Sequence, residues 1–435
     1  HAQVREIEAE RRRMAEADLP FEKEHWTREQ AVQYFEKMGW TDKAELMRYR
    51  PRREIMMYRM GGLCEYFYGA MLPSTGWVKT FSLKPHFPGM VLMMPSPADP
   101  SQSAKYHPHT KFLRVFGQSQ EWCHILGANN AADVNRMIQE GKLREFIRVN
   151  EALHDKSLSY IADEITSRGA KVVMIFGPSS SGKTTFAKRL GVQLRVLGLN
   201  PVLISLDDYF VDREKTPRDE NGEYDYEALE AIDLEQFNDH LKRLERGESV
   251  DIPRYDFISG TRQWHDNPLQ LDERSVLIVE GIHGLNPALT PGVPESRKFK
   301  IYVSCFTSVA LDNVSRIATS DNRLLRRLTR DYRTRGNDAL STLARWESVR
   351  RGEEKHIFPY QENADVMFNS SLFYEISVLR RFAEPILREV PDTVPEYGEA
   401  KRMLKFLDNF IPISPEEIPP TSLLREFIGG SSFKY

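Results

Sequence analysis

The stretch Gly177-Pro178-Ser179-Ser180-Ser181-Gly182-Lys183-Thr184 decides the fold of this chain. Two glycines separated by four residues, then a lysine and a threonine, form the P-loop pattern that binds phosphate groups. The apolar run 171–176 predicts a buried strand before the loop, and the residues from Thr185 onward predict an amphipathic helix after it. The N–H groups of such a loop and the positive helix end cradle phosphate oxygens, so we expect a nucleoside triphosphate site here.

The composition of the whole chain is that of a globular protein. Its 435 residues carry a net charge of −3, so no global basic field favours nucleic acid as a partner. Cys64, Cys123 and Cys305 lie far apart and form no CxxC pair, which favours a reducing, cytoplasmic location. No apolar run approaches the roughly 20 residues of a membrane span, so we expect no membrane contact. The oligomeric state stays open, with a homo-oligomer as one alternative.

The second half predicts an α/β architecture. Apolar runs at 202–206, 275–279 and 298–305 predict three further strands, and their continuous hydrophobicity favours a parallel sheet covered by helices. We expect helices over 234–246, 371–389 and 399–409.

The first half has a different texture. Residues 1–50 are mostly helical by pattern, with Thr27 beginning a helix that extends to about Met38. Short runs between 54 and 94 predict strands of an antiparallel or mixed sheet, and helical periodicity returns over 133–168. We therefore divide the chain into an α+β domain over 1–148 and a P-loop domain over 149–435.

Carboxylates follow the apolar strands next to the loop. Asp207 and Asp208 end the second strand, and Glu280 ends the third. Parallel strand ends meet at one sheet edge, so these groups should lie near Lys183, where they could accept a hydroxyl proton or hold Mg²⁺ with Thr184. Alone, either aspartate could equally be a helix cap.

The segment 323–335 holds six arginines. A solvated charged helix is the plain interpretation. Beside a phosphate site, the same side chains could instead close over the transferring group and exclude water. His283, three residues after Glu280, could enter the site or be a packed histidine.

Several blocks in order resemble the uridine kinase and phosphoribulokinase branch of P-loop kinases. They are the P-loop with Thr185, Ser205–Phe210, Ile252–Phe257, Val279–Ile282 and Arg326–Asp331. The resemblance covers roughly 170–370 and implies transfer of the γ-phosphate of ATP, with Mg²⁺, to a hydroxyl, most simply the 5′-OH of a uridine- or cytidine-like nucleoside.

The resemblance also implies residue roles. Asp207 matches the catalytic carboxylate, and Arg327, Arg330 and Arg335 match lid arginines around the phosphates held by Lys183. Tyr255 matches the nucleoside pocket, with Asp208 and Tyr209 beside it. Asp225 or Glu227 stands where the family places a carboxylate on the ribose hydroxyls, and Thr184 and Glu280 are the expected magnesium positions.

Two departures bear on the acceptor. Where uridine kinases carry a base-reading histidine, this chain has Ser259-Gly260-Thr261, which removes one discriminating hydrogen bond. Residues 308–319 also look inserted before the arginine segment.

The first half resembles the accessory, editing-type domain of threonyl-tRNA synthetases, on the residues 18–21 and 61–76. That domain uses an HxxxH and a CxxxH pair. Here Tyr68 stands four residues after Cys64, where that domain has the histidine of its CxxxH pair. The chain also has no HxxxH pair, so we expect no hydrolytic editing. Similar chains usually begin with a small TGS domain, and we expect the natural chain to start before His1.

Three functions are compatible with the sequence. The first is a nucleoside kinase. The second is a regulatory or RNA-associated NTPase that contacts tRNA through its first domain. The third is a kinase of another hydroxyl substrate, such as a sugar phosphate or pantothenate.

Overall fold

The computed structural model describes residues 2–87, 89–96, 99–219 and 222–435. The chain divides into two compact units, His1–His109 and Thr110–Tyr435. His1, where we expected the natural chain to be cut short, lies outside the described residues. The boundary proposed at residue 148 falls inside helix α6 (Leu143–Ser167), which belongs to the second unit.

The first unit combines helices with two antiparallel sheets. Its helices are α1 (Ala2–Glu16), α2 (Arg28–Lys37) and α3 (Thr41–Tyr49). Strands β1 (Glu22–Thr27), β2 (Glu54–Met60) and β3 (Leu63–Tyr66) form one sheet, and β4 (Ser82–His86) pairs with β5 (Gly89–Met93). The strands expected between 54 and 94 are confirmed. Strand β1 was not predicted, because its sequence is charged and most of its side chains stay exposed.

Helix α2 begins where its sequence predicts. Thr27 Oγ1 accepts a hydrogen bond from the Gln30 N–H at 3.2 Å, and Gln30 Oε1 accepts one from the Thr27 N–H at 2.8 Å. This capping box satisfies donors that have no partner inside the first turn of a helix.

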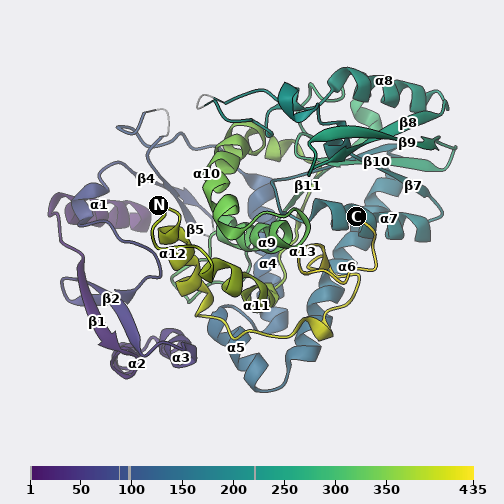
Figure 1. Cartoon of the computed structure of the whole chain (residues 1–435). Helices are drawn as coiled ribbons and strands as arrows, with labels where there is room; N and C mark the ends of the chain where they lie inside the picture. Colours follow the sequence, from purple (N-terminus) through teal and green to yellow (C-terminus); the bar gives the residue numbers. More distant parts are fainter. Residues whose placement is uncertain (1, 88, 97–98, 220–221) are drawn as a thin grey trace. The chain divides into compact units, whose positions relative to one another are not determined.

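The second unit is built around a parallel sheet of five strands in the order β12-β11-β6-β10-β7. Figure 1 labels β7, β10 and β11 of this sheet. The strands are β6 (Val172–Phe176), β7 (Asn200–Ser205), β10 (Ser275–Gly281), β11 (Lys298–Ser304) and β12 (Val366–Asn369). Every residue of β6 and β10 is buried, which explains their continuous apolar sequences. The expected α/β class is confirmed. Strand β12 was missed because four residues between helical segments give a weak signal.

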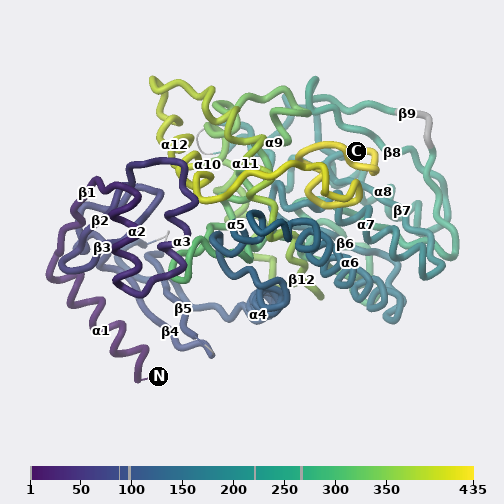
Figure 2. Tube along the Cα trace, turned by 90° about the horizontal axis from the view of Figure 1, so that it is seen from below, coloured from purple at the N-terminus to yellow at the C-terminus, as the bar shows by residue number. Residues whose placement is uncertain are grey.

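Helices and one hairpin complete the second unit. The helices are α4 (Thr110–Leu126), α5 (Ala131–Gln139), α6, α7 (Lys183–Val196), α8 (Leu234–Glu245), α9 (Thr319–Thr334), α10 (Ala339–His356), α11 (Glu375–Arg388), α12 (Tyr397–Leu407) and α13 (Arg425–Ile428). Strands β8 (Val250–Asp256) and β9 (Thr261–Leu269) form an antiparallel hairpin. Figure 2 shows the C-terminal segment, in yellow, ending near α7.

Candidate functional site

The loop between β6 and α7 has the backbone geometry of a phosphate cradle. Gly177 has φ 153°, and a Cβ atom there would overlap the carbonyl oxygen of Val303 on β11. Gly182 has φ 85°, in the left-handed region, and it caps α7. Both positions therefore need glycine, since side chains would strain the backbone or collide with a neighbouring strand.

Polar groups of this loop lack protein partners. The hydroxyls of Ser180 and Ser181 are buried and make no hydrogen bond in the described structure. Lys183 Nζ donates to the carbonyl oxygen of Pro178 at 3.1 Å, and burial lowers the pKa of this lysine. Buried donors without acceptors are costly, and phosphate oxygens are the acceptors that such a cradle suits. The loop therefore fits the phosphates of a nucleotide.

Glu280, at the end of β10, joins the loop to the neighbouring strand. One of its oxygens, Oε1, accepts from Thr184 Oγ1 at 3.0 Å and from Ser205 Oγ at 3.1 Å. Burial and the charge of Asp207 raise the pKa of Glu280 to about 7. Two hydroxyls and a carboxylate at the loop are hard oxygen ligands, and they suit Mg²⁺ that also binds phosphate. Ser205 was not anticipated, although its place before Asp207 at a strand end is a usable signal.

The two aspartates after β7 lie in a 3₁₀ turn, η2 (Leu206–Tyr209). The N–H of Asp207 donates to Ser205 Oγ at 3.3 Å, and this hydroxyl in turn donates to Glu280. Glu280 also binds Thr184, the neighbour of Lys183, so the three groups lie at one sheet edge. Asp208 Oδ1 accepts the N–H of Tyr255 at 3.2 Å, and burial raises the pKa of Asp208 to about 6.

Tyr209 does not reach this site. It is fully buried, and its hydroxyl lies 2.9 Å from Nδ1 of His240 on α8. Its ring also packs edge-on against Phe237. We expected Tyr209 to bind substrate, but a side chain without exposed surface cannot do so. The turn η2 places Tyr209, two residues after Asp207, in the core.

An aromatic wall stands beside the aspartates. The ring of Tyr255 lies 5.6 Å from that of Phe210 and 5.2 Å from that of Phe257. The guanidinium of Arg335 lies 4.4 Å from the centre of the Phe257 ring. Tyr255 itself is almost fully buried, so Phe257 offers the more exposed face of this wall.

The two acidic candidates of the acceptor side differ in environment. Asp225 Oδ2 lies 3.6 Å from Nε2 of His356 on α10. Glu227 packs against Gly352 of the same helix, and burial raises its pKa to about 7. His283 is buried, and its ring centre lies 6.4 Å from that of His356. The sequence left open whether Asp225 or Glu227 is the carboxylate of the acceptor pocket. Both side chains lie next to α10.

Helix α9 carries Arg327 and Arg330, and Arg335 is the residue at its C-terminal cap. We expected these three arginines to form a lid. Arg327 Nη1 donates to Ser179 Oγ of the loop at 3.0 Å. Asp331 gathers the others, with Arg330 at 2.8 Å, Arg327 at 3.3 Å and Arg335 at 3.8 Å. Burial and the charge of Arg330 lower the pKa of Arg335 to about 10. Asp331 thus holds three guanidinium groups close together, and one of them, that of Arg327, contacts the loop. Guanidinium groups are good hydrogen-bond donors to phosphate oxygens.

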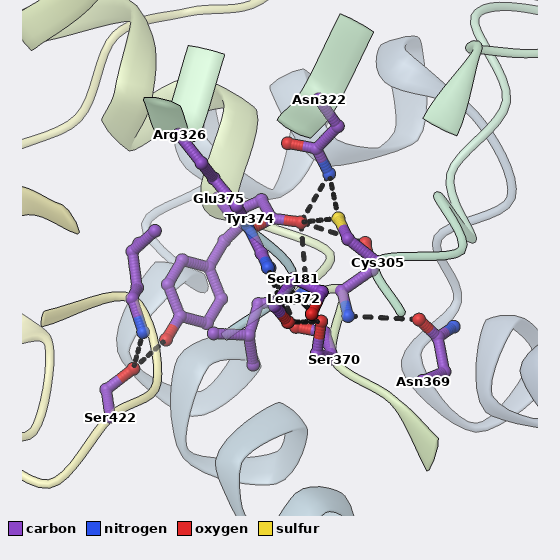
Figure 3. A network of polar contacts seen from close by, with 12 residues as sticks. Ser181, Cys305, Asn322, Arg326, Asn369, Ser370, Leu372, Tyr374, Glu375 and Ser422 are labelled. Atoms are coloured by element: carbon purple, nitrogen blue, oxygen red, sulfur yellow. Dashed lines mark hydrogen bonds and ion pairs between the residues drawn. The ribbon is translucent and has the colours of Figure 1, made fainter. Parts of the chain in front are cut away.

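Arg326 lies in a buried network of its own (Figure 3). It is fully buried, and its Nε donates to Glu375 Oε2 of α11 at 2.8 Å. It also donates to the carbonyl oxygens of Ser370 at 2.7 Å and of Ser181 at 3.4 Å. The Ser370 hydroxyl donates to the same Ser181 oxygen at 2.5 Å. This network holds the loop from behind through its backbone.

A second buried pair acts at the other end of the loop. Glu353 of α10 accepts the N–H of Ser179 at 2.9 Å, and Arg323 of α9 pairs with Glu353 while donating to the Ser179 carbonyl oxygen at 3.2 Å. Neither Glu353 nor Glu375 was predicted, since each is one acidic residue among the many charges of a helix.

In the part of the chain that the structure describes, no three His, Cys, Asp or Glu side chains gather as a metal-binding group. Cys64, Cys123 and Cys305 are buried and form no disulfide. No helix within the described ranges has the length and apolarity needed to cross a membrane.

Comparison with known proteins gives one family match. The model of the "Phosphoribulokinase / Uridine kinase family" matches residues 172–376. A uridine kinase of Staphylococcus aureus strain JH9 is 31% identical over 201 residues, which span 46% of this chain and 87% of that protein. The uridine kinase of strain Newman gives the same values.

Two solved structures are similar to part of this chain. A "possible uridine kinase" from Bacillus stearothermophilus is 22% identical with a TM-score of 0.28, over 46% of this chain and 89% of that one. D-glycerate 3-kinase from Cryptococcus neoformans is 13% identical with a TM-score of 0.27, over 59% of this chain and 87% of that one.

The parallel sheet and the P-loop agree with the family match over most of the relatives' length, so this chain belongs to the phosphoribulokinase and uridine kinase family of kinases.

Proposed function

We propose that the second unit transfers the γ-phosphate of ATP to a hydroxyl group of a small molecule, most simply the 5′-OH of a uridine- or cytidine-like nucleoside. The observation that carries this proposal is the set of hydrogen bonds at one sheet edge that links Asp207 through Ser205 to Glu280 and Thr184, next to Lys183. A phosphate cradle, a carboxylate and a metal position at one edge are what in-line phosphoryl transfer requires.

The donor side uses the loop and the residues after it. We assign the nucleotide phosphates to the loop residues Gly177, Pro178, Ser179, Ser180, Ser181, Gly182, Lys183, Thr184 and Thr185. Lys183 balances phosphate charge, and Thr184 with Glu280 would hold Mg²⁺, which supplies charge neutralisation at the phosphates. The buried, unpartnered hydroxyls of Ser180 and Ser181 support this assignment.

The acceptor side uses Asp207 as the proton acceptor. In the transfer, the acceptor oxygen forms a bond to the γ-phosphorus, the bond from that phosphorus to the β,γ-bridging oxygen breaks, and the acceptor proton passes to the Asp207 carboxylate. Arg327, Arg330 and Arg335 neutralise the equatorial oxygens and exclude water. ADP and a phosphate monoester are then the products.

The acceptor pocket that we propose lies between the aromatic wall and the acidic pair. Phe257 and Tyr255 would contact the flat part of the acceptor, and Asp225 or Glu227 would accept hydrogen bonds from vicinal hydroxyls, with Asp208 beside them. The turn at 259–261 is hydrogen-bonded within itself, since the hydroxyls of Ser259 and Thr261 lie 2.9 Å apart. It supplies no imidazole, and we therefore expect weak discrimination between bases.

A direct test is incubation of the protein with ATP and Mg²⁺ and a panel of acceptors, followed by mass analysis. The panel holds uridine, cytidine, the purine nucleosides, a pentose and D-glycerate. We expect nucleoside monophosphates, with uridine and cytidine among the nucleosides that are phosphorylated. Phosphorylation only of the sugar or the acid would keep the kinase and refute the nucleoside.

The first unit has no assigned activity. We propose that it serves as a scaffold or sensing domain of synthetase type, without editing, because Cys64 is buried and burial raises its pKa. Buried, unpaired cysteines in both units support a cytoplasmic location.

A further inference from the structure

The C-terminal segment, residues 422–435, contacts the nucleotide side of α7 directly. The carboxylate oxygen Oε2 of Glu426 accepts the N–H of Thr185 at 3.1 Å and the hydroxyl of Thr185 at 2.6 Å. The hydroxyl of Tyr435, the last residue, lies 2.8 Å from the same threonine oxygen. Thr185 is the residue directly after the P-loop, so the end of the chain occupies its polar groups.

These donors are the kind that bind a phosphate oxygen. The first turn of α7 presents N–H groups with no partner inside the helix, and the positive end of the helix dipole favours an anion there. A carboxylate and a phosphate compete for the same N–H and hydroxyl. The negative charge of Glu426 also acts on Lys183, where it opposes the effect of burial on the pKa of the lysine.

Side chains of α9 and α7 contact this segment. Arg333 of α9 donates to the carbonyl oxygens of Glu426 at 3.0 Å and of Phe427 at 3.2 Å. The guanidinium of Arg326 lies 5.0 Å from the centre of the Phe427 ring. Lys188 Nζ of α7 lies 5.6 Å from the centre of the Tyr435 ring. Glu426 is therefore presented to Thr185 by an ordered set of contacts.

We propose that Glu426 is a built-in competitor of the nucleotide phosphate at Thr185, and that it sets the affinity of the protein for its nucleotide. The proposal rests on the proposed function, since it requires that a nucleotide binds at the loop. While Glu426 contacts Thr185, the phosphate next to that residue meets an occupied donor pair and a like charge. The nucleotide gains these donors only when the carboxylate leaves them.

The test compares nucleotide binding in the full chain and in two variants. Glu426→Gln removes the charge but keeps an oxygen that can accept the Thr185 N–H, and Glu426→Ala removes both. The control is Glu416→Gln, the same charge change at an exposed position on the approach to the segment. The probe is MgADP, titrated by calorimetry, because it needs no acceptor and no turnover.

We expect Glu426→Ala to bind MgADP about tenfold more tightly than the parent, on the scale of one charge-assisted hydrogen bond, and Glu426→Gln to bind it more tightly by a smaller factor. Glu416→Gln should match the parent. Unchanged or weaker binding in both Glu426 variants would overturn the proposal, and it would assign Glu426 a role as a helix cap. If neither the parent nor any variant binds MgADP, the proposed function fails together with this inference.

Hydrogen exchange supplies an independent reading. With saturating MgADP, the peptide that spans residues 422–435 of the parent should lose protection, because Glu426 has left Thr185. In Glu426→Ala the same peptide should exchange quickly without the nucleotide. Full protection of this peptide in the parent with MgADP bound would contradict the competition.

Discussion

Replacing Arg326 by methionine tests how the phosphate loop is held. Arg326 and Glu375 are both fully buried, and the arginine also donates to the backbone carbonyl oxygens of Ser370 and Ser181. Removing one partner of such a pair leaves a buried charge without compensation, which costs about 3–5 kcal/mol. We therefore expect Arg326→Met to lower the free energy of unfolding by about that amount and to weaken MgADP binding.

The double variant Arg326→Met/Glu375→Gln removes both charges and keeps an acceptor for the groups that Glu375 binds, among them the N–H of Leu372 at 3.2 Å. It should therefore lose less stability than the sum of the two single variants, by about 2 kcal/mol. Arg388→Met is the control, because Arg388 pairs with Glu384 of the same helix at an exposed position and should cost about 1 kcal/mol or less.

Urea unfolding at neutral pH measures the free energies of the parent, of the single variants Arg326→Met and Glu375→Gln, of the double variant and of the control. Additivity of the two single variants within about 0.5 kcal/mol would refute the coupling between Arg326 and Glu375. An Arg326→Met protein with parental stability and parental MgADP affinity would refute the support of the loop altogether.

Three further outcomes follow from single side chains. Burial raises the pKa of Glu227 from 4.5 to about 7, so its protonated form contributes stability below pH 4.5 that is lost as the pH rises through 7; Glu227→Gln should remove up to about 3 kcal/mol of the difference between pH 5 and pH 8 in urea unfolding, and an unchanged slope would contradict this. Arg330→Gln should lower kcat by roughly a hundredfold or more in steady-state assays, while MgADP affinity changes by less than about threefold; a purely ground-state loss of affinity would contradict a lid role. Thr27→Ala should cost the first unit about 1 kcal/mol through the lost cap, visible as faster hydrogen exchange of α2, and protection equal to the parent would show that the cap adds nothing.

The phosphate side of the site was predictable from sequence because its signals are local. The strand before Gly177, the loop and the helix after it follow one another along the chain, and each has its own pattern. The positions of Asp207 and Glu280 also followed from sequence, since the carboxyl ends of neighbouring parallel strands meet at one edge.

The supports of the loop were not predictable, because they depend on contacts between distant segments. Glu353 and Glu426 lie 174 and 241 residues from Ser179 and Thr185, which they bind, and Glu375 acts on the loop through Arg326, 49 residues away. An acidic residue on a helix is usually exposed, and only the packed structure shows that these reach the loop. Tyr209 failed for the opposite reason, since its neighbours in sequence point to the site while the turn places its ring in the core.

The central claim is that Asp207 accepts the proton of a hydroxyl while the loop binds the nucleotide independently. The measurement that tests it most directly compares the initial rate of phosphorylation of the best acceptor, and the affinity for MgADP, between the parent and Asp207→Asn. We predict a loss of at least about a hundredfold in kcat, on the scale of a removed general base, with MgADP affinity nearly intact. Turnover of Asp207→Asn at the parental rate would contradict it.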